Sequence, residues 1–189
     1  MNVLPTDLPG VLVIEPKVFG DSRGFFFEVW REDRYAPHGI GPRFVQDNHS
    51  KSSHGTLRGL HLQLEHAQGK LVRVLAGEIY DVAVDVCVGS PTFGKYTALT
   101  LSAENRRQLW VPPNYAHGFV VTSAEAEVEY KCTDYYHPAS EVSVLWNDPA
   151  IGIPWPVTNP LLSAKDAQAI ALANAAAAGK LPRWSGNLR

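Results

Sequence analysis

Cysteine, clustered charge and long apolar runs are all scarce in this sequence, and each shortage narrows what the protein can be. Its two cysteines, Cys87 and Cys132, lie far apart within apolar runs, as buried reduced thiols do. No segment approaches the roughly 18 apolar residues of a membrane-spanning helix. The N-terminus also lacks a cationic stretch followed by an apolar one. We therefore expect a cytoplasmic protein with no membrane partner.

Charge of one sign is not concentrated anywhere along the chain. Seventeen Lys and Arg against nineteen Asp and Glu give a formal net charge of −2, and the basic residues are scattered. This argues against a nucleic-acid partner, although a small anionic ligand needs only a few converging cations. With 189 residues, 45% hydrophobic and 19% charged, the chain is expected to form one globular domain over residues 1–189.

Helical periodicity is nearly absent before Pro160, and short strand-like runs take its place. Such runs between turn signals predict an all-β body over about 11–156, as a jelly roll, an up-and-down barrel or an immunoglobulin-like sandwich. Gly77-Glu78 predicts a tight hairpin and residues 90–94 a longer turn. The runs are 11–16, 24–30, 43–48, 57–63, 70–76, 78–86, 95–101, 106–111, 117–122, 127–133 and 141–146.

One helix is predicted at the C-terminus, over about 163–179, because LLSAKDAQAIALANAAAAGK is rich in alanine and reaches a glycine. Ser163-Ala164-Lys165-Asp166 has the spacing of a capping box at its start, so helix capping alone could explain Asp166.

His61 and His117 stand beside glycines in strand-like runs, GLHLQ and YAHGFVV. In small barrels of the cupin type, similarly spaced histidines bind a metal. Here Gln63 takes the position of a second histidine, and no carboxylate stands four or five residues beyond it. Two imidazoles and an amide are a poor ligand set for zinc or ferrous iron, so no metal is expected. A histidine without a metal can move protons instead.

Strand alternation over 57–63 leaves the direction of His61 open. It places His61 on the side of Leu57 and Gln63, away from three leucines that share their face with Arg58. His61 then faces either water or a cavity. Tyr130 alternates with charged neighbours and faces the apolar side, as a core tyrosine or as an acid in a pocket.

Taken together, these motifs resemble the dTDP-4-dehydrorhamnose 3,5-epimerase family from about Val11 to Asp166. The segments that carry the resemblance are GDSRGFFFE (20–28), FVQDNHS (44–50), LRGLHLQ (57–63), QGKLVRVLAGEIYDVAVDV (68–86), SPTFGKY (90–96), LSAENRRQLWVP (101–112), AHGFVV (116–121), YKCTDYY (130–136), LWNDPAIGIPWP (145–156) and LSAKD (162–166).

The resemblance implies a homodimeric cupin jelly roll that uses no metal or organic cofactor and inverts C3 and C5 of dTDP-4-dehydro-6-deoxy-D-glucose. It also implies a base at His61, an acid at Tyr130, an orienting carboxylate at Asp166 and an oxyanion stabiliser at Lys70. The implied substrate-binding residues are Arg23, Glu28, Gln46, Asn48, Arg58, His117, Glu141 and Lys165.

Rival functions remain at this point. A relative that inverts one carbon, or a cupin that isomerises the keto group of the same sugar nucleotide, would use similar residues. A non-catalytic sugar-nucleotide-binding module would bind dTDP without proton exchange, and a metal-dependent cupin oxygenase would hold an ion through His61 and His117.

Overall fold

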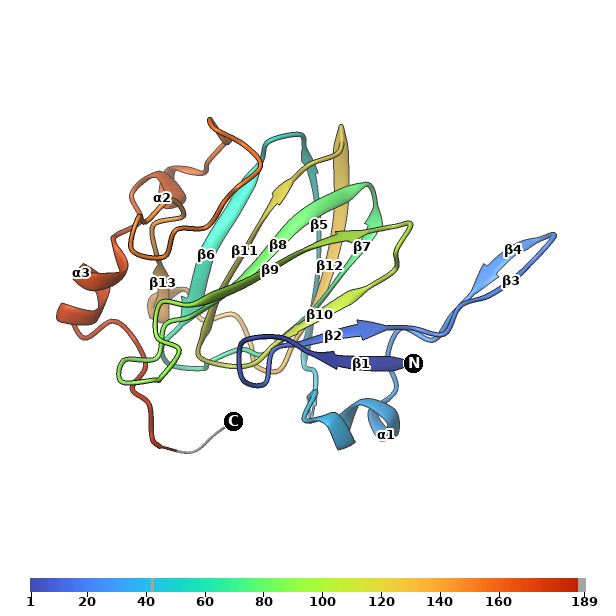
Figure 1. The fold of residues 1–189 in the computed structure, drawn as a ribbon, viewed down its shortest axis with the longest axis horizontal. Helices are drawn as coiled ribbons and strands as arrows, with labels where there is room; N and C mark the ends of the chain where they lie inside the picture. Colours follow the sequence, from blue (N-terminus) through green and yellow to red (C-terminus); the bar gives the residue numbers. More distant parts are fainter. Residues whose placement is uncertain (42, 187–189) are drawn as a thin grey trace.

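Two antiparallel sheets packed face to face form the body of the computed structural model, which describes residues 1–41 and 43–186 (Figure 1). The six-stranded sheet has the order β1-β2-β10-β7-β12-β5, with strands Asn2–Pro5, Leu12–Glu15, Gln108–Val111, Lys70–Ala76, Glu125–Cys132 and Gln46–Ser53. The five-stranded sheet has the order β13-β6-β11-β8-β9, with strands Glu141–Ser143, Leu57–Gln63, Tyr115–Val121, Glu78–Asp85 and Tyr96–Ser102. The predicted all-β jelly-roll sandwich is confirmed.

Three apolar clusters hold these layers together. The central one lies between the sheets and includes Val72, Leu109 and Phe119. The outer face of the five-stranded sheet is covered by the C-terminal segment, where Leu172 packs with the cluster around Val82. The outer face of the six-stranded sheet is covered by a third cluster, to which the short helix α1 (Glu32–Tyr35) contributes. Apolar area removed from water on both faces stabilises both sheets.

The single helix predicted over 163–179 is wrong in one respect, because two short helices occupy this region, α2 (Ala164–Ala167) and α3 (Leu172–Ala177). Between them Ile170 forms an isolated bridge with Val144 at the edge of the five-stranded sheet. The Asp148 carboxylate then accepts a hydrogen bond from the Leu172 N–H, at 2.6 Å. These tertiary contacts outweigh the helix propensity of alanine. No helix of the described residues is long and apolar enough to cross a membrane.

The tight hairpin predicted at Gly77-Glu78 is also wrong. Gly77 joins β7 of one sheet to β8 of the other, so the turn is a corner between layers. Its φ of +73° and a backbone oxygen 2.0 Å from where a Cβ would lie explain the glycine. The longer turn at 90–94 does join two paired strands, β8 and β9, as predicted.

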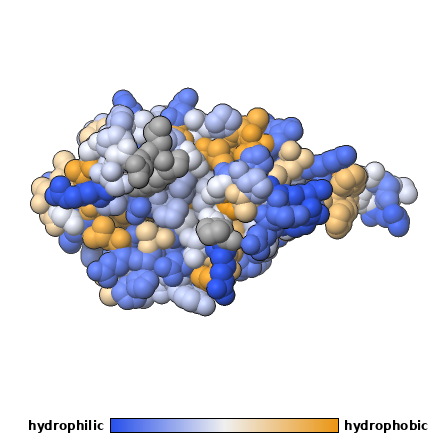
Figure 2. All heavy atoms as spheres, turned by 90° about the horizontal axis from the view of Figure 1, so that it is seen from below, coloured by the Kyte–Doolittle hydropathy of each residue, from blue (hydrophilic) through white to orange (hydrophobic). Residues whose placement is uncertain are grey.

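A two-stranded hairpin, β3 (Phe19–Asp21) and β4 (Gly24–Phe26), projects from the body (Figures 1 and 2). Its apolar side chains lie behind a hydrophilic tip, and Phe19, Phe25 and Phe26 are 54%, 60% and 70% exposed. A patch of this kind, next to a sheet, is typical of a surface that another protein covers.

Candidate active site

A cavity of about 730 Å³ opens between the two sheets, where β5, β7 and β12 face β6 and β11. Polar residues take the place of core leucines here, and β5 turns alternate positions towards it. Most residues singled out in the sequence line this cavity: Gln46, Asn48, Arg58, His61, Lys70, His117, Tyr130, Glu141, Lys165 and Asp166.

A β-bulge in β6 decides which way Arg58 points. His61 is paired with His117 on β11, whereas Arg58 is paired with Phe119, so three steps along β6 match two along β11. Because side chains alternate between faces, the extra residue brings Arg58 and His61 to the same face. Both line the cavity, so the prediction that Arg58 shares its face with the leucines is wrong.

Two glycines allow this bulge. A Cβ on Gly59 would lie 2.5 Å from the Cα of Gly118, and one on Gly118 would lie 2.7 Å from a backbone oxygen of Arg58. The backbones of β6 and β11 therefore approach more closely here than any side chain would permit. Leu60 and Leu62 remain on the other face of β6, buried in the outer cluster.

His61 is held by a carboxylate from a distant segment. Its Nε2 lies 2.5 Å from Oδ1 of Asp166, at the start of α2. The other oxygen of Asp166 accepts a hydrogen bond from the Ser163 hydroxyl, at 2.8 Å, and the Asp166 N–H donates to the same hydroxyl. The helix cap and the contact with the imidazole thus coexist, because one carboxylate has an oxygen for each.

The charge of Asp166 follows from its surroundings. Burial alone raises the pKa of its carboxyl, but the hydrogen bonds from His61 and Ser163 and the charge of Lys165 outweigh it. The pKa therefore lies below its usual value, and Asp166 is a carboxylate at neutral pH. A carboxylate here favours an N–H on Nε2 of His61, which leaves the lone pair on Nδ1.

Tyr130 and Lys70 enter the cavity from the six-stranded sheet. Tyr130 is paired with Asn48, and Lys70 with Cys132, which places them on neighbouring rows. Loss of solvent contact raises the pKa of the Tyr130 phenol, with the nearby Cys132 adding to this. Desolvation also lowers the pKa of the Lys70 ammonium. The phenol therefore keeps its proton at neutral pH, and the ammonium is poorly hydrated.

A second carboxylate lies on the open side of His61. Oε1 of Glu141 is 3.9 Å from the Nδ1 of His61 and 2.7 Å from the Lys165 ammonium, while its other oxygen accepts from the Tyr136 hydroxyl at 2.9 Å. Burial alone raises the pKa of the Glu141 carboxyl. Together, the hydrogen bonds from Lys165 and Tyr136 and the positive charges nearby have the larger effect, so the pKa lies below its usual value. The imidazole therefore lies between two carboxylates.

His117 forms a parallel arrangement deeper in the sandwich. Its Nε2 lies 2.5 Å from Oδ1 of Asp81, and both residues are buried. On the opposite wall Ser50 has a buried hydroxyl with no hydrogen-bond partner among the described residues. Nearby, Ser52 accepts hydrogen bonds from the Arg58 guanidinium, at 3.0 and 3.1 Å, and fixes its direction.

Arg23 and Glu28 do not reach the cavity within one chain. Arg23 lies on the projecting hairpin with its side chain 87% exposed, and its guanidinium pairs with Asp21. Glu28 instead pairs with Arg31 and Arg34. The structure therefore separates these two residues from the other candidates.

Several residues of the cavity were not found from the sequence. Tyr136, Gln68 and Ser50 line it, and Asp81 supports His117. None stands in a spacing that marks a site, since each is a common polar or aromatic residue in a strand or loop. Among the described residues, no three His, Cys, Asp or Glu side chains come together as metal ligands would.

Comparison with known proteins identifies similar chains. The family model described as dTDP-4-dehydrorhamnose 3,5-epimerase matches residues 5–174. A protein of that name from Neisseria gonorrhoeae is 58% identical over 88% of this chain, which spans about half of that protein, 51%. This chain spans more than nine tenths of other relatives with the same name.

Two solved structures are also similar. The dTDP-6-deoxy-D-glucose-3,5-epimerase from Legionella pneumophila, in complex with dTDP-4-keto-L-rhamnose, is 52% identical with a TM-score of 0.93, over 98% of this chain and 99% of that one. A 3′-monoepimerase from Streptomyces bikiniensis, in complex with dTDP-quinovose, is 34% identical with a TM-score of 0.90, over 95% of this chain and 92% of that one.

Proposed function

The chain belongs to the dTDP-4-dehydrorhamnose 3,5-epimerase family and is an epimerase of this kind, and we propose that the cavity around His61 is where it acts. The substrate is dTDP-4-dehydro-6-deoxy-D-glucose, and inversion at C3 and C5 gives dTDP-4-dehydro-L-rhamnose. The observation that carries the site is the hydrogen bond between Asp166 and His61 inside a cavity that also receives Tyr130 and Lys70.

The reaction needs a base, an acid and a stabilised oxyanion around one sugar ring. C3 and C5 both flank the C4 ketone, so each can lose its proton while the C–H electron pair moves towards the C4 oxygen. The enolate then takes a proton at the same carbon from the opposite face, and the ketone re-forms. Nothing is oxidised or reduced. The base returns the proton that it gained to solvent, and the acid takes a proton from solvent to replace the one that it gave.

His61 supplies the base through Nδ1. The charged Asp166 keeps the proton on Nε2 and stabilises the imidazolium that forms when Nδ1 takes the substrate proton. General base catalysis of this kind contributes roughly 10²- to 10⁴-fold to the rate. That is too little alone for a carbon acid, so stabilisation of the oxyanion is also required.

Lys70 and Tyr130 supply the other two functions. The poorly hydrated Lys70 ammonium stabilises the developing charge on the C4 oxygen, an effect worth about 3–4 kcal/mol for one positioned donor. The Tyr130 phenol, whose pKa is raised by burial, holds the proton that the enolate receives on its other face.

Binding of the diphosphate and nucleoside involves the remaining residues. Arg58, fixed by Ser52, offers a guanidinium fork to phosphate oxygens. We assign further contacts to Gln46, Asn48, His117, Glu141 and Lys165, which line the same cavity.

Arg23 and Glu28 complete this site from a second copy of the chain in a homodimer. The apolar hairpin that carries Arg23 projects from the body, as a segment that packs on another protomer would. Light scattering should give the mass of two chains. An active monomer would remove this part of the proposal.

Isotope exchange tests the activity directly. The protein is incubated with the keto sugar nucleotide in D₂O, and deuterium at C3 and C5 is followed by NMR. Label at both carbons is expected for the 3,5-epimerase. Label at one carbon alone would indicate a monoepimerase, the activity named for the Streptomyces bikiniensis neighbour. Label at neither carbon, with dTDP still bound, would indicate a binding module.

We also infer a cytoplasmic location. Cys87 and Cys132 are both buried thiols, as is usual for proteins of a reducing compartment. Cell fractionation with an antibody against the chain tests this inference, and recovery from an extracytoplasmic fraction would overturn it.

A further inference from the structure

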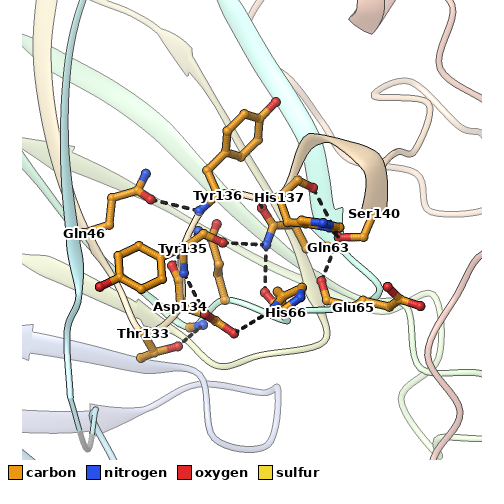
Figure 3. Close-up of polar contacts among 12 residues, drawn as sticks. Gln46, Gln63, Glu65, His66, Thr133, Asp134, Tyr135, Tyr136, His137 and Ser140 are labelled. Carbon is orange, nitrogen blue, oxygen red and sulfur yellow. Dashed lines mark hydrogen bonds and ion pairs between the residues drawn. The ribbon is translucent and has the colours of Figure 1, made fainter.

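Three glutamine side chains hold the backbone of one short segment at the edge of the cavity, Asp134–His137. Gln68 donates to the Asp134 carbonyl at 2.8 Å, and the Gln46 side-chain oxygen accepts from the Tyr136 N–H at 2.9 Å. Gln63 bonds the residues on either side of Tyr136 (Figure 3). Each of the four residues thus has one backbone group bound by a glutamine.

Gln63 is the centre of this arrangement. Its amide nitrogen donates to the carbonyls of His66, at 2.7 Å, and Tyr135, at 3.2 Å, and its oxygen accepts from the His137 N–H at 2.9 Å. Gln63 is only 5% exposed, so water does not compete for these groups. Three of the four hydrogen bonds that an amide can make are therefore used on backbone.

The position of this segment affects the active site through the side chain of Tyr136. Its backbone is held by the glutamines, and its hydroxyl donates to Glu141, the carboxylate that faces the Nδ1 of His61 at 3.9 Å. A shift of this backbone would move the phenol and leave Glu141 held by the Lys165 ammonium alone, so that the carboxylate could turn about that contact. Misplacement of about 1 Å near a reacting group can cost roughly 10²-fold in rate.

We infer that Gln63 and Gln68 are positioning residues for the epimerase reaction, which act through Tyr136 to fix Glu141 beside His61. Neither touches the reacting carbons in this assignment. The inference rests on the proposed function, because it gives the free nitrogen of His61 the role of base.

The test compares two buried glutamines that each hold a neighbouring segment by hydrogen bonds. Gln63→Met keeps the length of the side chain but makes none of its three backbone bonds. Gln108→Met is the matched control. Gln108 is 1% exposed, donates to the Val29 carbonyl at 2.8 Å and accepts from the Tyr35 hydroxyl at 3.2 Å, but it lies outside the cavity. Both variants are measured for thermal unfolding and for the kcat and KM of deuterium exchange at C3 and C5.

We expect Gln63→Met to lower kcat by about tenfold or more, whereas Gln108→Met changes it by less than about twofold at a similar loss of stability. In a Tyr136→Phe background, Gln63→Met should lower kcat by less than about a further twofold, because both changes break one chain of contacts. Equal kcat in the two methionine variants, or independent multiplication with Tyr136→Phe, would overturn the inference.

Two further measurements keep these outcomes distinct. If Gln63→Met does not fold, Gln68→Met, which loses one backbone bond, is tested in the same way with the same expected signs. The wild-type enzyme reports on the proposed function itself. Absence of exchange in the wild type contradicts the epimerase assignment, whereas normal wild-type exchange with an unaffected Gln68→Met contradicts only the role of the glutamines.

Discussion

Replacement of Asp166 by asparagine separates the two roles of its carboxylate, which binds His61 with one oxygen and the Ser163 hydroxyl with the other. Asparagine has nearly the same shape and retains the backbone N–H that donates to Ser163 at 3.1 Å. The helix cap therefore survives, while the negative charge beside the imidazole is lost.

Each consequence has an expected magnitude. Without a carboxylate at Nε2, His61 can take the wrong tautomer, and the imidazolium loses its stabilising charge. The same change in a catalytic triad lowers turnover by roughly 10⁴-fold, so a fall in exchange of about 10³- to 10⁴-fold is expected. Stability should fall by only about 1 kcal/mol, the difference between a charged and a neutral hydrogen bond. For a chain of this size that is about 2–4 °C in Tm.

Ser163→Ala is the matched variant. It removes the cap and costs about 0.5–2 kcal/mol, but it leaves the contact between Asp166 and His61 in place. We expect its exchange rate to stay within about tenfold of the wild type. Deuterium uptake measured by NMR, beside thermal unfolding, distinguishes the two. If Asp166→Asn lost as much stability as Ser163→Ala and kept its exchange rate, Asp166 would be a helix cap and nothing more.

Four further predictions follow from the same contacts. Lys70→Met should slow exchange by about 10²- to 10³-fold with the calorimetric affinity for dTDP unchanged, and a parallel loss of affinity would instead make Lys70 a binding residue. Tyr130→Phe should still incorporate deuterium while forming little inverted product, because His61 can return a proton to the face it came from; normal product formation by NMR would contradict this. The carboxyl pKa values of Asp166 and Glu141 lie below their usual range, so the folded state binds fewer protons than the unfolded one there. The stability that these two carboxylates give to the folded state is fully present above pH about 4.5. It is lost as pH falls through their lowered pKa values. Thermal unfolding between pH 3 and 6 should show a fall in Tm with falling pH that is smaller in Glu141→Gln than in the wild type. The same dependence of Tm on pH in both proteins would contradict this contribution of Glu141. Arg23→Ala should weaken dTDP binding without lowering Tm, since its side chain is 87% exposed in one chain, and unchanged affinity would exclude Arg23 from the site.

Strands were predictable where the local pattern alone decides them. The runs 57–63 and 70–76 match β6 and β7 to the residue, because their apolar positions fill both faces of buried strands. The first strand, Asn2–Pro5, was missed because it is short and exposed at a sheet edge. The sequence predicts a hairpin at Gly77 where the structure has a corner, because both turns use a glycine at positive φ and tertiary packing alone decides the partner strand.

In the candidate site, too, a local sequence pattern does not show which distant residues come together. His61 and Asp166 are 105 positions apart, and a capping box was sufficient reason for the carboxylate at its own position. Only resemblance to a family connected the two residues. The support of Asp134–His137 by glutamines was not predictable, because the partners of their amides are backbone atoms of a distant segment. The sequence drew attention to Gln46 and Gln63 for other reasons, and to Gln68 for none.

The cavity depends on the one place where β6 departs from regular alternation. With no extra residue at Gly59, Arg58 would face away from the cavity whenever His61 faced into it. Two other cations among the described lining residues are Lys70, which is assigned to the C4 oxyanion, and Lys165, which is paired with Glu141 at 2.7 Å. A diphosphate would then meet no guanidinium from this chain. The paired glycines of β6 and β11 therefore bring together, on one face, the residue that we assign to the diphosphate and the residue that we assign as the base.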